Sequence, residues 1–166
     1  MAPKLTYLGI LLCLVAVAWI DFKTQKISNR WTLLNLIVFV GLLCLSPLHP
    51  LTFLALIYPV LMLLVGFVLF ILNVMGAGDA KYLASLFLII PLTWQAPFFE
   101  LLVLSTCLVA SVLIIVNILR NYSRVIGEIR NRNLKGLSSC FGTRFSYAPV
   151  ILFAWLWFAV EFRILN

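Results

Sequence analysis

Long apolar runs separated by short polar segments dominate this chain, and most charged residues lie between the runs. A helix needs about 20 predominantly apolar residues to cross the hydrocarbon core of a bilayer. The pattern predicts six membrane-spanning helices, at residues 5–22, 31–46, 51–72, 79–96, 98–119 and 147–165. We expect Pro59 and Gly66 to bend the third helix, and Pro91 and Pro97 to frame the turn between the fourth and the fifth.

The composition supports an all-α, polytopic integral membrane protein. The 166 residues are 64% hydrophobic and 10% charged, with a mean hydropathy of +1.16, whereas a globular chain is about 45–50% apolar and 25% charged. We interpret residues 1–166 as one membrane-embedded domain, because too little polar sequence remains for a separate soluble module. The net charge of +7 indicates anionic lipid rather than nucleic acid, since the basic residues flank apolar spans.

The distribution of lysine and arginine predicts the orientation. Ten of the twelve basic residues lie in three segments that six spans would place on one side, at residues 21–30, 73–81 and 120–146. The positive-inside rule assigns this side to the cytoplasm and both termini to the outside. Within residues 120–146, apolar and basic positions alternate at helical spacing, which predicts a basic amphipathic segment on the membrane surface.

Residues 1–18 also resemble a signal peptide, with small residues at 16–18 as a cleavage site. The charge after this apolar run exceeds the charge before it, which favours a retained first span. The four cysteines, Cys13, Cys44, Cys107 and Cys140, show neither a C-x-x-C pair nor a cysteine–histidine spacing. We therefore expect no metal site and no disulfide, and interpret the cysteines as packed thiols.

Only two aspartates occur in the chain, and each lies at the end of an apolar run. Asp21 closes the first predicted span and Asp79 opens the fourth, so the topology places both at the cytoplasmic boundary. A carboxylate at membrane depth costs roughly 2.5–3.5 kcal/mol and usually marks a functional position. Among the glutamates, Glu100 and Glu161 fall on the outer side and Glu128 lies in the basic cytoplasmic segment.

Two neighbouring carboxyl groups that share a proton can hydrolyse a peptide bond without a metal or a covalent intermediate. The ionised member takes a proton from water, and the protonated member donates to the carbonyl that the water attacks. Which aspartate plays which part stays open. Alternatively, Asp21 merely ends a helix at the water interface and Asp79 merely caps the next one. Their convergence on one side favours a catalytic pair.

Four other residues are candidates for supporting this pair. Gly76 and Gly78 lack a β-carbon and would let a substrate backbone approach Asp79 closely. Lys81 could balance charge near the pair, or extend to lipid phosphates. Asn29 is expected to support the turn after Asp21.

Three segments resemble the type IV prepilin peptidases, a family of intramembrane aspartyl proteases. Residues 76–81 read Gly-Ala-Gly-Asp-Ala-Lys and resemble the family's Gly-x-Gly-Asp-x-Lys signature. Residues 21–29, Asp-Phe-Lys-Thr-Gln-Lys-Ile-Ser-Asn, resemble its other aspartate motif. Residues 144–149, Arg-Phe-Ser-Tyr-Ala-Pro, are similar to the Pro-Tyr-Ala-Pro segment that opens the last helix, with Ser146 in place of the first proline.

The resemblance implies removal of a short basic leader from pilin-like precursors at the cytoplasmic membrane face, with Asp21 and Asp79 as catalytic residues. Larger members add an amino-terminal domain with paired cysteines and methylate the new amino terminus. This chain lacks that domain, so methyltransferase activity and S-adenosylmethionine are not implied, and no cofactor is expected. It looks like the short form of tight-adherence (Flp-type) pilus systems; archaeal preflagellin peptidases usually carry an additional soluble part.

Three alternatives remain open at this stage. One is a small transporter or proton-conducting protein, disfavoured because no acid lies near the predicted midplane. Another is a non-catalytic scaffold of a secretion complex. Proteases of the presenilin kind also use Gly-x-Gly-Asp, but they carry a Tyr-Asp pair and a Pro-Ala-Leu motif that this chain lacks.

Overall fold

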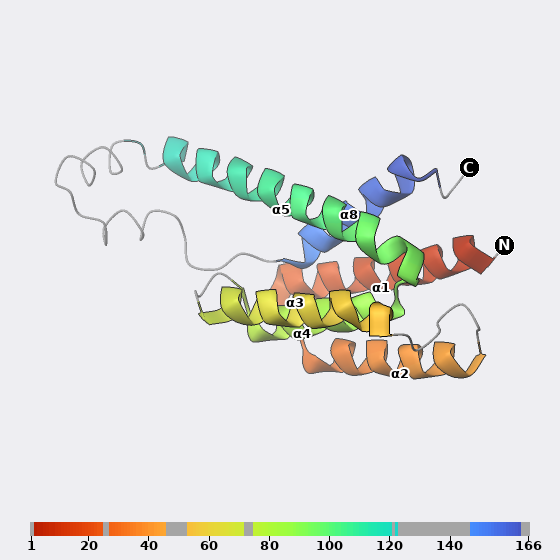
Figure 1. The fold of residues 1–166 in the computed structure, drawn as a ribbon. Helices are drawn as coiled ribbons and strands as arrows, with labels where there is room; N and C mark the ends of the chain where they lie inside the picture. Colours follow the sequence, from red (N-terminus) through yellow and green to blue (C-terminus); the bar gives the residue numbers. More distant parts are fainter. Residues whose placement is uncertain are drawn as a thin grey trace.

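The computed structural model describes residues 2–24, 27–45, 53–71, 75–120, 122 and 147–163. These residues form six helices (Figure 1). Their bounds are α1 Ala2–Thr24, α2 Asn29–Leu45, α3 Phe53–Ile71, α4 Ala77–Ile89, α5 Leu92–Arg120 and α8 Ala148–Glu161. The predicted amphipathic segment lies almost wholly outside the described residues, as do Cys140 and Glu128. The all-α fold class is confirmed.

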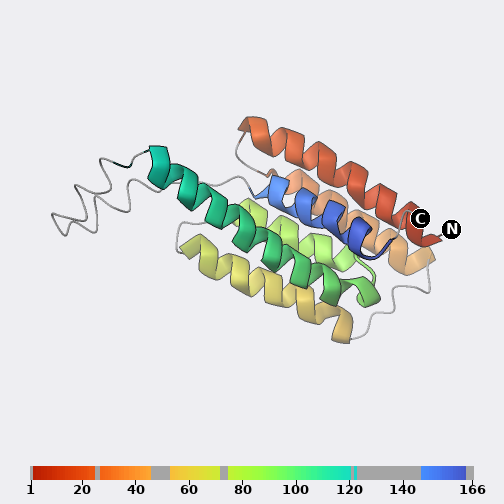
Figure 2. The ribbon, with the colours of Figure 1, turned by 90° about the horizontal axis from the view of Figure 1, so that it is seen from above.

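Successive helices run in opposite directions, so the bundle has two distinct ends (Figures 1 and 2). One end holds both termini. The other end gathers the end of α1, the start of α2, the end of α3, the start of α4, the end of α5 and the start of α8. We call this second end the loop end. The helix ends that flank the three segments placed on one side by the charge pattern thus lie at the same end of the bundle.

Two helices occupy the inside of the bundle. α4 packs against α2 and α3, while α8 packs against α1 and α5. Close packing of α3 on α4 depends on Gly66, since a β-carbon there would lie 2.5 Å from the β-carbon of Ala80. α3 runs without interruption through both Pro59 and Gly66. The outer faces of α1, α2, α3 and α5 leave many large apolar side chains exposed.

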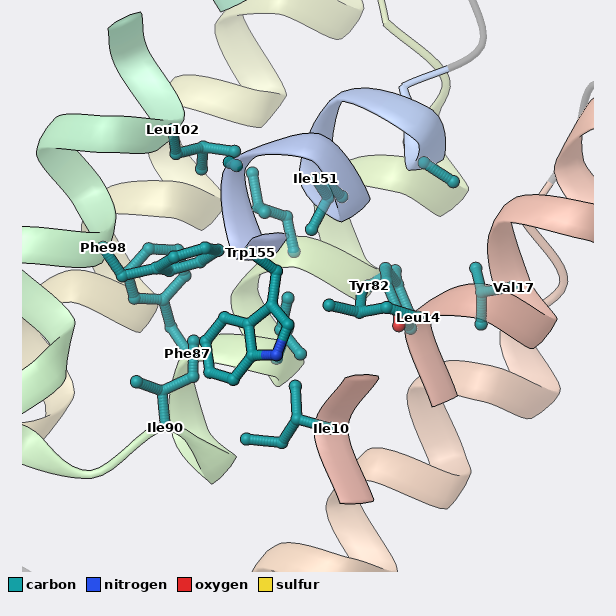
Figure 3. Packing of buried hydrophobic residues seen from close by; sticks show 14 of the residues in the cluster. Ile10, Leu14, Val17, Tyr82, Phe87, Ile90, Phe98, Leu102, Ile151 and Trp155 are labelled. Carbon is teal, nitrogen blue, oxygen red and sulfur yellow. The ribbon is translucent and has the colours of Figure 1, made fainter. Parts of the chain in front are cut away.

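Aromatic side chains in the core connect the first helix, α1, to the last, α8. Tyr7 of α1 and Trp155 of α8 stack with ring centroids 5.1 Å apart. The Tyr7 hydroxyl donates to the Trp155 carbonyl at 3.2 Å, and the Trp155 indole N–H donates to the Tyr7 carbonyl at 3.4 Å. Trp155 also meets Phe98 of α5 edge to face, and Figure 3 shows Trp155 and Phe98 beside Phe87 of α4.

The helices have the character of a membrane protein. α1 from Lys4 to Thr24, α3 and α5 are each long and apolar enough to cross a bilayer, while α2 and α8 are shorter apolar helices. Since α4 has only 13 residues, it spans about 20 Å, less than a hydrocarbon core of about 30 Å. The chain is an integral membrane protein, and a full crossing by all six helices stays a prediction.

The break between the fourth and fifth helices differs from the prediction. α4 ends at Ile89 and α5 begins at Leu92, so Pro97 lies inside α5 rather than at the turn. A residue before proline is driven to extended geometry, and Ile90 has a ψ of 127°. Pro91 therefore ends α4 alone. Pro97 removes only the N–H that would reach the Thr93 carbonyl in the first turns of α5.

Two prolines leave helical carbonyl groups without a backbone donor, and one side chain bonds to both groups. Pro59 and Pro91 each stand four residues after a helical carbonyl, those of Ala55 and Phe87, and cannot donate to it. The side-chain amide of Gln95, which is 1% exposed, lies 3.3 Å from the Ala55 oxygen and 2.9 Å from the Phe87 oxygen. The same amide nitrogen also donates to the Ile90 carbonyl oxygen at 3.2 Å. Gln95 thus joins α3, α4 and α5.

We expect Gln95→Leu to destabilise the protein by about 1–3 kcal/mol, because the carbonyl groups lose their hydrogen-bond donor. Thermal unfolding in detergent, followed by tryptophan fluorescence, measures the effect. Thr93→Val, at an exposed position two residues away, is the matched control and should have the same melting temperature as the wild type. Equal melting temperatures for all three proteins would show that the carbonyls do not depend on Gln95.

Candidate active site

The two aspartates lie at the loop end of the bundle, 58 positions apart in sequence but on neighbouring helix ends. Asp21 is in the last turn of α1 and Asp79 in the first turn of α4. Both are buried, with 1% of Asp21 and 7% of Asp79 exposed. The alternative in which Asp21 ends a helix at the water interface does not fit this burial, because an interfacial carboxylate would be hydrated.

Asp21 accepts a hydrogen bond from the last helix. The backbone N–H of Ala148, the first residue of α8, donates to Asp21 Oδ2 at 3.2 Å. The neighbouring Lys23 points elsewhere, with its ammonium 4.8 Å from the centroid of the Trp19 ring. Asp21 is thus oriented by the start of α8, within the segment 144–149 that the sequence singled out.

Asp79 accepts backbone donors from two segments. The Gly76 N–H donates to Asp79 Oδ2 at 3.3 Å, so Asp79 does cap the start of α4, as one of the alternatives held. The backbone N–H of Ile27, in the turn after α1, also bonds to its carboxyl group. In addition, the charge of Asp21 acts on Asp79. Asp79 therefore caps α4 and is also subject to the charge of Asp21; a catalytic pair stays a prediction.

The predicted glycines have different surroundings. A β-carbon at Gly78 would lie 2.5 Å from the Ile27 carbonyl oxygen, so Gly78 is what lets the α1–α2 turn approach α4. A β-carbon at Gly76 would lie 3.1 Å from Asp79 Oδ2. Gly78 therefore sets the distance between the turn after Asp21 and the helix that carries Asp79. A role for either glycine in admitting a substrate stays a prediction.

The other two candidates lie at the edge of the site. Lys81 is exposed on α4 and lines an apolar groove of about 360 Å³ between α3 and α4, with Phe67 and Phe70 among its walls. Asn29 is the first residue of α2 rather than part of the turn, and its side chain is exposed. Their supporting roles stay predictions.

Sequence reasoning missed the backbone groups around the pair. The amides of Ala148 and Ile27 carry no side-chain signal, and their contacts depend on how helices from distant parts of the chain pack. One indication was available, since Pro149 is typical of the first turn of a helix and therefore marked a start at this end. Among the described residues, no three His, Cys, Asp or Glu side chains gather as metal ligands would.

An apolar helical bundle that buries two interacting carboxyl groups at one end defines a membrane protein with a site suited to acid–base chemistry. The family model of the type IV leader peptidase family matches residues 8–119, more than half of the chain. The chain therefore belongs to the type IV leader peptidase family, and it is a membrane peptidase. Comparisons with curated proteins and with solved structures found no similar chain. The match includes both aspartates and ends before residues 144–149.

Proposed function

We propose that this protein is an aspartyl endopeptidase in which Asp21 and Asp79 together activate water. The observation that carries the proposal is the placement of two buried, electrostatically interacting carboxyl groups at one end of the bundle. Two buried carboxyl groups that interact cannot readily both be ionised, because like charges repel each other, and a shared proton removes one of the charges. The pair then holds a base and an acid at the same time.

Hydrolysis follows from that state. The ionised carboxylate takes a proton from a water molecule, the oxygen attacks the scissile carbonyl, and the protonated carboxyl donates to the carbonyl oxygen. When the tetrahedral intermediate collapses, the C–N bond breaks and the departing nitrogen, which becomes the amino terminus of the mature pilin, takes a proton from the carboxyl pair. The leader is released with the new carboxyl group. The backbone donors at Gly76, Ile27 and Ala148 hold the two carboxyl groups in place, which keeps the reacting atoms aligned.

We propose pilin-like precursors as the substrates, cleaved after a short basic leader at the cytoplasmic face of the inner membrane. Family membership supports prepilin substrates. The charge pattern supports the orientation, because the connecting segments at the loop end carry most of the basic residues. A substrate helix in the bilayer would bring the junction with its leader to the depth of the carboxyl pair. A Flp-type pilus or secretion system is the proposed context.

Reconstitution tests this function directly. The purified protein in liposomes should shorten a pilin precursor by the mass of its leader, measured by mass spectrometry, without added metal or S-adenosylmethionine. The transporter alternative instead predicts proton flux in the same liposomes with the precursor mass unchanged, and a scaffold predicts neither. An intact precursor after prolonged incubation with folded protein would reject the peptidase proposal for this substrate class.

A further inference from the structure

The first turn of α8 offers one backbone donor, and Asp21 accepts it. The N–H groups at the start of a helix have no partners within the helix. Here Val150 and Ile151 donate to the Tyr147 carbonyl, at 3.0 and 3.2 Å, and Pro149 has no N–H. The N–H of Ala148 donates to Asp21 Oδ2. Among residues 148–151, the Ala148 amide is therefore the one that bonds to the carboxylate.

The start of α8 is itself held from α5. The hydroxyl groups of Tyr147 and Thr106 lie 2.7 Å apart, and the Thr106 hydroxyl donates to the Leu102 carbonyl, also at 2.7 Å. Since that bond uses the only hydroxyl hydrogen of Thr106, Tyr147 is the donor between the two. A continuous series of bonds therefore runs from α5 through Tyr147 and the Ala148 amide to Asp21 on α1.

We propose that the start of α8, Tyr147 with Ala148, is a positioning element for Asp21. The inference rests on the proposed aspartyl mechanism and extends it beyond residue 119, where the family match ends. A buried carboxylate with a fixed donor keeps one orientation, and the positive end of a helix favours its negative charge. The Tyr147–Thr106 bond determines where the amide of Ala148 lies.

This role is separable from holding α8 in the bundle. The reciprocal bonds and ring stacking of Tyr7 and Trp155 attach α8 to α1 about two turns away. Trp155 also packs on Phe98 of α5. Loss of the Ala148 donor should therefore leave the fold intact while it loosens Asp21.

Replacing the amide at Ala148 by an ester tests the proposal most directly. Incorporation of lactic acid at position 148 exchanges the N–H for oxygen and keeps the methyl side chain. With a pilin precursor as substrate, we expect kcat to fall about tenfold, as for loss of a positioning hydrogen bond, with KM and the melting temperature nearly unchanged. The matched control is the same ester at Ala55, in the first turn of α3 at the opposite end. Equal kcat values for the two esters would overturn the proposal.

Tyr147→Phe is a second variant, and unlike the ester it can be made by ordinary mutagenesis. Tyr147→Phe should lower kcat without raising KM. When it is combined with the ester, the fold-decrease in kcat should be smaller than the product of the two separate fold-decreases, because both changes act on one donor. Tyr122→Phe, at an exposed position, is its control. Additive effects of Tyr147→Phe and the ester would count against a single positioning element.

These results separate the positioning role from the catalytic proposal. If Asp21→Asn is inactive while the ester at 148 keeps full kcat, only the positioning role is wrong. If Asp21→Asn cleaves the precursor normally, the aspartyl mechanism itself is wrong, whatever the ester does.

Discussion

Asp21→Asn and Asp79→Asn should each lower the rate of leader removal by about 10³-fold or more, the range expected when a general acid or base is lost. Asparagine keeps the shape of the side chain but can neither take a proton from water nor release one to the substrate. Both variants should accumulate in the membrane and unfold near the wild-type temperature, because no packing group is removed. Mass spectrometry of a pilin precursor and thermal unfolding in detergent provide the two measurements.

Glu100→Gln and Glu161→Gln are the matched controls for these variants. They make the same carboxyl-to-amide change at exposed positions, Glu100 in the third turn of α5 and Glu161 at the end of α8. Their cleavage rates should stay within about twofold of the wild type, as for most surface substitutions. A normal rate for either aspartate variant would exclude the shared-proton mechanism, and an equal loss in the controls would indicate a general effect of charge.

Much of the fold was predictable because a bilayer imposes a length on apolar runs. The helices centred on α1, α2, α3 and α8 were placed within a few residues from hydropathy alone. The boundary between α4 and α5 was predicted at the wrong residues because either of two prolines, Pro91 and Pro97, could end a helix. The effect of each depends on what satisfies the freed carbonyls, and the role of Gln95 in this arises only from packing.

The side chains of the candidate site could be predicted from the sequence, but the backbone groups that contact them could not. Asp21 and Asp79 were identifiable because carboxyl groups are rare beside apolar runs, and the family match supports the resemblance on which their roles rest. The structure adds that both are buried and that they interact. The amides of Ile27 and Ala148 could not be predicted, because every residue except proline carries the same donor. Only the approach of distant helix ends selects these two.

Gly78→Ala should lower the cleavage rate about 100-fold, since a displacement of about 1 Å in an active site can cost that much. The added β-carbon would lie 2.5 Å from the Ile27 carbonyl oxygen, which belongs to the backbone and cannot rotate away as a side chain would. The turn after α1 must therefore move from α4, and the Ile27 amide moves with it from the Asp79 carboxyl.

Gly41→Ala is the control that isolates this effect. Gly41 lies inside α2, and a β-carbon there would meet nothing within 4 Å. Alanine favours a helix interior over glycine by about 1 kcal/mol, so Gly41→Ala should not destabilise α2, whereas Gly78→Ala adds the close contact with Ile27. We expect Gly41→Ala to cleave the precursor at the wild-type rate and to melt at or above the wild-type temperature. If Gly78→Ala behaved like Gly41→Ala, the close approach of the α1–α2 turn to α4 would not be needed to hold Asp79.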